Sequence, residues 1–241
     1  VTQLTLSRLG SFNEVLMRWQ GPVSAAIHVE DPVLNVINAV CHNQVLTERG
    51  NVYIHLMRKI GKLYPVNQLR NLALSSVTTD YVFLTDADFI PNKDLYKSML
   101  NVVASSDTNR TKRAYVVAAF GVFEEKEKNK PAKFPDFPET RETLLQLWDS
   151  KAIEPVHFTK FIHGHYQTNY TRWRKATELY PITWFHHYEP YVVVRTIDVP
   201  LYEGAFLERY FDKVSHIFHL HKVGFEFWGI PNVYTVHMPH A

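Results

Sequence analysis

The segment YVFLTDADFIP, residues 81–91, decides the fold assignment, because a short apolar run leads directly into two carboxylates one residue apart. Residues 81–84 have the length and composition of a buried strand. In open α/β folds, ligands bind beyond the carboxyl ends of such strands. Asp86 and Asp88 could there offer oxygen atoms to a hard divalent cation and leave coordination positions for a diphosphate. An acidic turn is the alternative interpretation, since the tripeptide by itself is a weak motif.

Strand and helix patterns alternate along the chain before this segment. Strands are predicted over residues 2–6, 23–28 and 52–56, and helices over 12–19, 32–40 and 65–75. Asp31 is the predicted N-cap of the second helix, with Pro32 at its first position. The β-α-β-α-β-α-β order implies an α/β fold with a mostly parallel central sheet, flanked by helices and joined by right-handed crossovers.

The second half of the chain is less regular. The patterns predict helices over residues 95–103, 140–148 (capped by Thr140) and 212–221, and strands over 115–120, 191–195 and 233–237. Residues 124–137 are charged and contain proline, which indicates a surface loop. Residues 157–184 are rich in aromatic side chains and histidine with little periodicity, which favours a site built from loops. Without a linker or a repeat, residues 1–241 are predicted to form a single domain.

Composition narrows the class of protein. The chain has 241 residues, 46% hydrophobic and 21% charged, as expected for one folded globular domain. The net charge is +2 without a block of like charge, which argues against a nucleic-acid surface or a polybasic membrane contact. Cys41 is the only cysteine, so an internal disulfide and a thiolate metal cluster are excluded. The longest apolar stretch, residues 114–123, is too short to span a bilayer, and no signal peptide is recognisable.

Six blocks of sequence identify a family resemblance that covers essentially the whole chain. The chain resembles the LARGE-type glycosyltransferases of family 49, which include the glucuronyltransferase module of LARGE and the related beta-glucuronyltransferase of the dystroglycan pathway. The blocks are YPVNQLRN (64–71), FLTDADFIP (83–91), GHYQTNYTRW (164–173), EPYVVVR (189–195), KVSHI (213–217) and VHMPHA (236–241). The resemblance implies a GT-A fold, a nucleotide-sugar donor and a manganese cofactor.

The implied chemistry assigns roles to the acidic pair. As a nucleoside diphosphate leaves, a divalent cation would neutralise the growing charge by Lewis-acid catalysis. Asp86 and Asp88 would supply oxygen ligands, and in GT-A enzymes a third ligand commonly comes from a histidine after the last core strand. His237 is the better candidate, with His240 in reserve and also expected near the donor. Mixed oxygen and nitrogen ligands suit Mn²⁺ better than Ca²⁺.

Donor recognition is expected at the first strand and on the helix over residues 65–75. Gln3 and Ser7 are the predicted uridine contacts. Arg70 and Asn71 are predicted to face the donor, because a guanidinium offers planar donors to phosphate or to a sugar carboxylate. A salt bridge across the helix surface is the alternative for Arg70.

Acceptor binding is expected on the loop over residues 163–173. His165, Asn169 and Trp173 combine hydrogen-bonding groups with a flat apolar face that could hold a sugar. A core anchor is the alternative for Trp173. Asn169 also begins a glycosylation sequon, as does Asn109, and the two sequons are compatible with a secretory lumen. An exposed, glycosylated Asn169 would conflict with a site role.

The family modules transfer glucuronic acid with inversion, which requires a general base for the acceptor hydroxyl. Asp212 and Glu189 are the candidates, with Asp212 slightly favoured. LARGE-like proteins carry a Gly/Phe/Trp-rich loop with Asn before the lysine, whereas this chain reads LERYFDK over residues 207–213. Loss of the glycines should stiffen this loop and leaves the acceptor and the donor sugar open.

The leading hypothesis is therefore an inverting, Mn²⁺-dependent glycosyltransferase that moves a sugar, glucuronic acid by resemblance, from a UDP-sugar to a glycan or glycoprotein acceptor. The resemblance also suggests the Golgi lumen, with a type II membrane anchor outside this sequence. A glycan-binding module without turnover is the alternative. A zinc hydrolase built from the 13 histidines is disfavoured, because the chain has no His-Glu-x-x-His motif.

Overall fold

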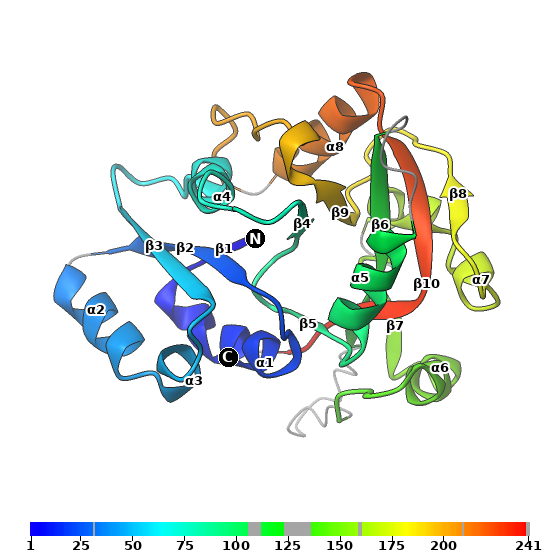
Figure 1. Cartoon of the computed structure of the whole chain (residues 1–241), viewed down its shortest axis with the longest axis horizontal. Coiled ribbons are helices and arrows are strands. Elements are labelled where there is room, and N and C mark those ends of the chain that lie inside the picture. The colour runs from blue at the N-terminus through cyan, green and yellow to red at the C-terminus, as the bar shows by residue number, and fades with distance from the viewer. Residues whose placement is uncertain (31, 106–111, 123–135, 159–160, 209, 240–241) are drawn as a thin grey trace, which may run out of the picture.

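The first three strands of the chain form a parallel sheet with β2 in the centre. A computed structural model describes residues 1–30, 32–105, 112–122, 136–158, 161–208 and 210–239. In it β1 (Thr2–Leu4), β2 (Val23–Val29) and β3 (Val52–Arg58) lie in the order β1-β2-β3. All seven residues of β2 are buried, because helices cover both faces of this sheet. Helices α1, α2 and α3 lie on one face and α4 on the other (Figure 1).

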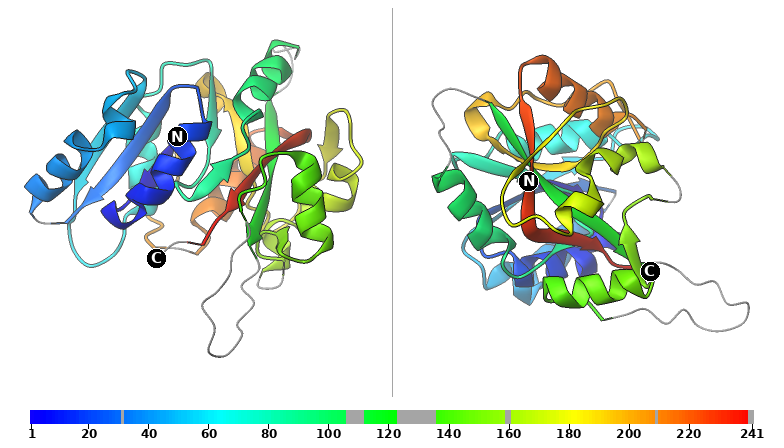
Figure 2. Two further views of the ribbon diagram at one scale, coloured as in Figure 1. Left: turned by 90° about the horizontal axis from the view of Figure 1, so that it is seen from below. Right: turned by 90° about the vertical axis from the view of Figure 1, so that its right-hand side faces the viewer.

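Seven further strands form a second, mixed sheet. Its main order is β4-β9-β6-β10-β5, with β7 beside β6 and β8 beside β10. Only β6 and β10 pair in parallel; the other neighbours are antiparallel. The two sheets lie side by side (Figure 2). The strands are β4 (Tyr81–Leu84), β5 (Phe89–Pro91), β6 (Arg113–Val122), β7 (Ile153–Pro155), β8 (Tyr180–Ile182), β9 (Tyr191–Arg195) and β10 (Glu226–His237).

Hydrogen bonds on both sides of Val1 connect the two sheets. The Val1 nitrogen donates to the Phe83 carbonyl at 2.7 Å, and the Thr85 nitrogen donates to the Val1 carbonyl at 3.2 Å. This is the bonding pattern of parallel neighbours, so β4 continues the parallel series β3-β2-β1. Strand β9 departs from that series and runs antiparallel to both β4 and β6. It follows the irregular region 157–184 and not a crossover helix, so it is free to take the opposite direction.

Eight α-helices and four short 3₁₀ helices complete the described residues. They are α1 (Leu9–Arg18), α2 (Val33–Cys41), α3 (Gln44–Thr47), α4 (Val66–Leu74), α5 (Leu95–Ala104), α6 (Arg141–Asp149), α7 (Tyr170–Trp173), α8 (Asp212–Lys222), η1 (Leu6–Arg8), η2 (Ile162–Gly164), η3 (Tyr166–Thr168) and η4 (Thr196–Asp198). None of the described helices is both long and apolar enough to cross a bilayer.

Most predicted elements are present with shifted ends. Thr140 caps α6 as predicted, since its hydroxyl accepts from the Thr143 nitrogen at 3.2 Å. The first strand ends at Leu4, because the chain turns into η1. Pro32 precedes α2 without a side-chain cap, and Asp31 lies outside the described residues, as do Asn109 and residues 124–135 of the predicted surface loop. The short elements α3, β5, β7 and β8 were not predicted, because three or four residues carry too little periodicity.

The second sheet has an aromatic core that anchors the irregular region 157–184. Trp173 is fully buried and packs against Phe120 and Tyr234, with ring centroids 5.2 and 6.2 Å away. Tyr180 is also buried, and its hydroxyl donates to the Thr168 carbonyl at 2.8 Å. These contacts fix the loops that precede β9.

The contact between Tyr180 and Gly229 leads to a stability prediction. A methyl group on Gly229 would overlap the Tyr180 ring, whereas one on Gly10 would meet nothing within 4 Å. We expect Gly229→Ala to lower the free energy of unfolding by about 1–3 kcal/mol through overpacking. Gly10→Ala, the matched control in α1, should raise it by about 0.5–1 kcal/mol. Urea unfolding of both variants measures the difference, and a Gly229→Ala chain as stable as the parent would contradict the packing argument.

Candidate active site

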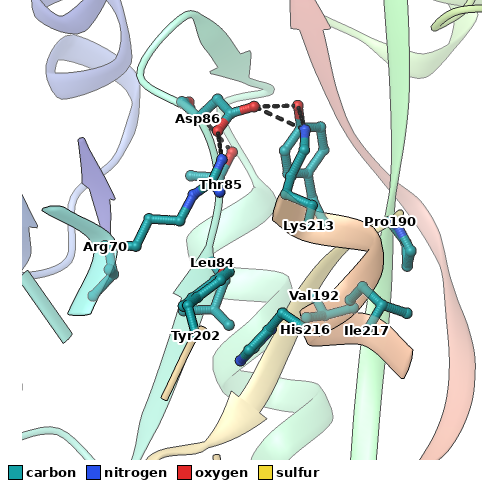
Figure 3. A pocket seen from close by; sticks show the side chains of 12 residues that line it. Arg70, Leu84, Thr85, Asp86, Pro190, Val192, Tyr202, Lys213, His216 and Ile217 are labelled. Carbon is teal, nitrogen blue, oxygen red and sulfur yellow. Dashed lines mark hydrogen bonds and ion pairs between the residues drawn. The ribbon is translucent and has the colours of Figure 1, made fainter. Parts of the chain in front are cut away.

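Asp86 lies directly after β4, where the two sheets meet, and three side chains hold its carboxylate. Arg70 from α4 donates to Oδ1 at 3.1 Å. Lys213 from α8 and the Tyr191 hydroxyl from β9 each donate to Oδ2 at 2.9 Å. Figure 3 shows Arg70 and Lys213 converging on Asp86. Four separate elements therefore meet at one carboxylate, and these residues line the same small pocket.

Arg70 joins Asp86 to a second carboxylate. Its side chain is only 7% exposed, and its Nη1 donates to Asp212 at 2.6 Å and to Asn67 at 2.9 Å. The surface salt bridge considered as an alternative is therefore excluded by burial. Arg70 points into the junction between α4, β4 and α8, where it pairs with Asp86 and Asp212. The predicted donor contact of Arg70 stays a prediction.

The electrostatics keep this cluster charged. Burial raises the pKa of Asp86, but Lys213 and Arg70 more than offset it and hold that pKa far below its usual range. Burial lowers the pKa of Lys213, whereas Asp86 and Glu189 raise it, with a net upward shift. Burial and the neighbouring Asp86 carboxylate raise the pKa of Tyr191 well above its usual value, so its hydroxyl remains a donor. At neutral pH the carboxylate and both cations are fully ionised.

Asp88 and His237 come together beside this cluster, as predicted. Their Oδ2 and Nε2 atoms are 3.6 Å apart, and Arg8 lies 4.0 Å from the same oxygen. The pairing of β5 with β10 explains the approach, because His237 is opposite Phe89. A carboxylate oxygen and an imidazole nitrogen fit the ligand preferences of Mn²⁺.

Asp86 does not complete that pair in this structure. Its two oxygens face Arg70, Lys213 and Tyr191, so the predicted set of three ligands is not assembled. Within the described part of the chain, no three His, Cys, Asp or Glu side chains are grouped as metal ligands. Among the described residues, Asp88 and His237 are the two predicted metal ligands that lie together.

The two candidate bases have different surroundings. Asp212, the first residue of α8, is bound through Oδ2 by Arg70, and its Oδ1 accepts from the Tyr210 nitrogen at 3.3 Å. By contrast, no hydrogen bond or ion pair between described residues engages the Glu189 carboxylate. Burial, assisted by Asp212 and Asp86, raises the pKa of Glu189 in spite of Lys213. The pKa of Glu189 is thus shifted upward from its ordinary value, in the direction expected of a general base.

Of the residues predicted to contact the donor, Arg70 reaches the acidic pair, whereas the others that the structure describes have different partners. Gln3 accepts a hydrogen bond from the Tyr64 hydroxyl, and Ser7 is exposed with its hydroxyl 2.8 Å from that of Thr5. Asn71 binds the backbone of Tyr202 with both amide atoms, at 2.8 Å each. These two hydrogen bonds connect the 196–206 segment to α4, and the donor contact predicted for Asn71 stays a prediction. His240 lies outside the described residues.

The acceptor predictions need one clear correction. Trp173 has no exposed surface, and its indole nitrogen donates to the Ile230 carbonyl at 3.1 Å, so it is a core anchor that cannot stack on a sugar. Asn169 is exposed, adopts φ 53° and caps α7 by accepting from the Arg172 nitrogen at 3.0 Å. This capping role accounts for an asparagine at position 169 without any contact to a ligand. His165 is buried beside Tyr191, and burial, with Lys213 nearby, holds its pKa well below the usual value.

Sequence reasoning missed several residues of the pocket. Lys213 and Tyr191 stand in two of the six blocks, so their position in those blocks was the available signal. His216 stands in the same block as Lys213, whereas Tyr202 lies outside all six blocks. Their rings stack 3.7 Å apart, and His216 is hydrogen-bonded to the Pro200 carbonyl at 2.9 Å. Burial lowers the pKa of His216 to about 4, so the ring is neutral at physiological pH.

Comparisons with known proteins agree with this geometry. Residues 33–238 match the family model described as glycosyl-transferase for dystroglycan. The whole chain is 36% identical to xylosyl- and glucuronyltransferase LARGE2s of Danio rerio and 36% identical to LARGE1 of Homo sapiens. In both cases the matched part is 31% of the relative, so the chain spans about a third of their length. The resemblance drawn from the sequence is confirmed.

Solved structures support the fold. GalNAc-T7, determined with UDP, GalNAc and Mn²⁺, superposes with a TM-score of 0.54 at 11% identity, over 99% of this chain and 43% of that one. TarS of S. aureus superposes with a TM-score of 0.53 at 10% identity, over 99% of this chain and 36% of that one. Identities this low show the fold alone. The predicted GT-A fold is confirmed.

The buried ion cluster generates the next prediction. Arg70→Met removes the cation between Asp86 and Asp212, and each carboxylate would then lack one buried partner. We expect the free energy of unfolding to fall by about 3–5 kcal/mol, as when one partner of a buried pair is lost. Arg174→Met is the matched control, since it removes an exposed ion pair with Asp149 and should change little. Guanidinium unfolding measures the free energy of unfolding of both variants. An equal decrease in both would contradict the argument that the buried ion pairs contribute more to stability than the exposed one.

Proposed function

Because the chain belongs to the family of glycosyltransferases for dystroglycan, we propose that it transfers a sugar from a UDP-sugar to a glycan or glycoprotein acceptor. The approach of Asp88 to His237, beside the charged cluster around Asp86, carries the proposal. This arrangement lies at the end of β4, and ligands of open α/β sheets bind beyond the carboxyl ends of such strands. The fold neighbour TarS was determined with UDP-GlcNAc.

Asp88 and His237 would hold Mn²⁺. When bound, this ion would neutralise the charge that develops on the diphosphate leaving group. Asp86, fixed by Arg70 and Lys213, would keep the 85–88 turn in one conformation, so that Asp88 faces His237 before the donor arrives. The cluster is preorganised, and little reorganisation is then needed on binding.

Glu189 would act as the general base. In a transfer with inversion, the acceptor oxygen bonds to the sugar C1 as the bond between C1 and UDP breaks, and the hydroxyl proton passes to the base. Glu189 is the better candidate because its carboxylate is unpaired among the described residues and its pKa is raised. Asp212, which the sequence slightly favoured, is held by Arg70 and by the Tyr210 nitrogen, so it would serve as a structural anion.

The relatives are xylosyl- and glucuronyltransferases, which favours UDP-glucuronate or UDP-xylose as the donor. Glucuronic acid remains the leading choice from the sequence blocks. By the same resemblance we infer a place in the Golgi lumen. The alternative is a module that binds a glycan without turnover, and the first experiment distinguishes this alternative from a transferase.

The first experiment measures UDP release from a panel of UDP-sugars, with and without Mn²⁺ and without an acceptor. We expect release only with Mn²⁺, fastest with UDP-glucuronate or UDP-xylose. Asp88→Asn should reduce release by about 10²-fold, in line with the loss of a positioned charged ligand. Tyr53→Phe, an exposed position on β3, is the control and should retain full activity. Tight glycan binding without release from any donor would favour the non-catalytic alternative.

The second experiment tests the base. Glu189→Gln should slow transfer to an acceptor by about 10²–10⁴-fold, the usual contribution of a general base. Donor-only UDP release should change far less. Since the base must be ionised, kcat/KM should fall as the pH drops through the raised pKa of Glu189, and this acidic limb should disappear in the variant. Asp212→Asn showing the larger loss of transfer would instead assign the base to Asp212.

A further inference from the structure

Three solvent-exposed aromatic rings form a row at the surface near Glu189. Phe161 is 38% exposed and Phe211 is 53% exposed, and His187 lies between them. The centroids of Phe161 and His187 are 6.1 Å apart, and those of His187 and Phe211 are 5.7 Å apart. The rings come from three separate segments, just before η2, between β8 and β9, and just before α8. We call these three residues the aromatic rim.

The rim is adjacent to the candidate base. A Cβ atom on Gly164 would lie 2.9 Å from the Phe161 ring and 3.1 Å from Glu189 Oε1, so the ring edge and the carboxylate meet over this glycine. The Glu189 nitrogen also donates to the Gly164 carbonyl at 2.8 Å. Phe211 directly precedes Asp212 and Lys213, which both act on the charge of Glu189. One surface therefore contains an unpaired carboxylate and a row of rings.

Two of these rings belong to residues whose backbone conformation costs free energy. His187 has φ 68° and Phe211 has φ 59°, in the left-handed region that bulky residues rarely adopt. Such conformations persist only where the surrounding structure enforces them, and they concentrate at ligand sites. For Phe211 the first turn of α8 does so, because the Ser215 nitrogen donates to the Phe211 carbonyl at 2.8 Å.

We propose that the aromatic rim is the acceptor subsite, on which one pyranose ring of the acceptor stacks while its reacting hydroxyl faces Glu189. This inference rests on the proposed function. The C–H face of a pyranose is apolar and about as wide as an aromatic ring, so stacking removes apolar surface from water on both sides. Its hydroxyl groups remain at the edge, where Glu189 can accept one. The subsite thus replaces the contact that the sequence assigned to Trp173, and it includes Phe211.

The test is a binding measurement that needs no turnover. Saturation-transfer NMR with methyl β-xyloside as the probe reports which C–H protons lie against aromatic protons of the protein. For Phe161→Ala and Phe211→Ala we expect the dissociation constant to rise about 3- to 10-fold, the worth of one stacked ring. Phe211→Trp should retain binding, whereas Phe211→Leu, which keeps the bulk without the flat ring, should lose it. Tyr53→Ala, which removes an exposed ring on β3, is the matched control.

Kinetics separate this inference from the proposed function. In every rim variant the acceptor KM should rise by the same factor as the dissociation constant, and donor-only UDP release should stay unchanged. Absence of saturation transfer in the parent chain, or equal losses in Tyr53→Ala and the rim variants, would overturn the subsite. If no donor releases UDP, the proposed function fails. The binding measurement with methyl β-xyloside still tests whether the aromatic rim binds a sugar.

Discussion

The structure depends on the ion pairs that the half-buried Asp86 carboxylate makes with two cations. Arg70 and Lys213 reach this carboxylate from α4 and α8, and Tyr191 reaches it from β9. Ions removed from water are stable only with such compensation, so the elements that carry them must meet in one arrangement. Arg70 extends the constraint to Asp212, and Asn71 to the backbone of Tyr202. The charges thus connect the N-terminal sheet to the helix and strand that form the second half of the site.

The same ion pairs give the two carboxylates of the acidic pair different surroundings. Between the two carboxylates, Ala87 is buried in the core of the N-terminal sheet, which fixes the turn. Asp86 then faces the cations, and Asp88 faces His237. Two carboxylates that the motif presents as equivalent therefore have different partners in the folded chain, and only Asp86 lies between Arg70 and Lys213.

The surface that we propose as the acceptor subsite is built in a different way. It relies on loops, on a glycine that admits Phe161 and Glu189 to the same place, and on backbone conformations that cost free energy. These loops are held by a rigid aromatic core in which Trp173 and Tyr180 take part. The charged cluster around Asp86 and the packed loops both adjoin Glu189, whose carboxylate no described side chain engages through a hydrogen bond or ion pair.

The sequence by itself determined the alternating elements of the first half, the acidic pair after β4 and the family. Those features depend on local periodicity, on residues close together in the chain and on six contiguous blocks, so they can be read in one dimension. Only the tertiary structure decided that Arg70 is a buried bridge, that Trp173 is a core anchor, that β9 runs antiparallel between β4 and β6, and that Asp212 is paired while Glu189 is not. Each of these depends on partners tens to more than a hundred residues away, and burial and pairing belong to those contacts and not to the residues themselves.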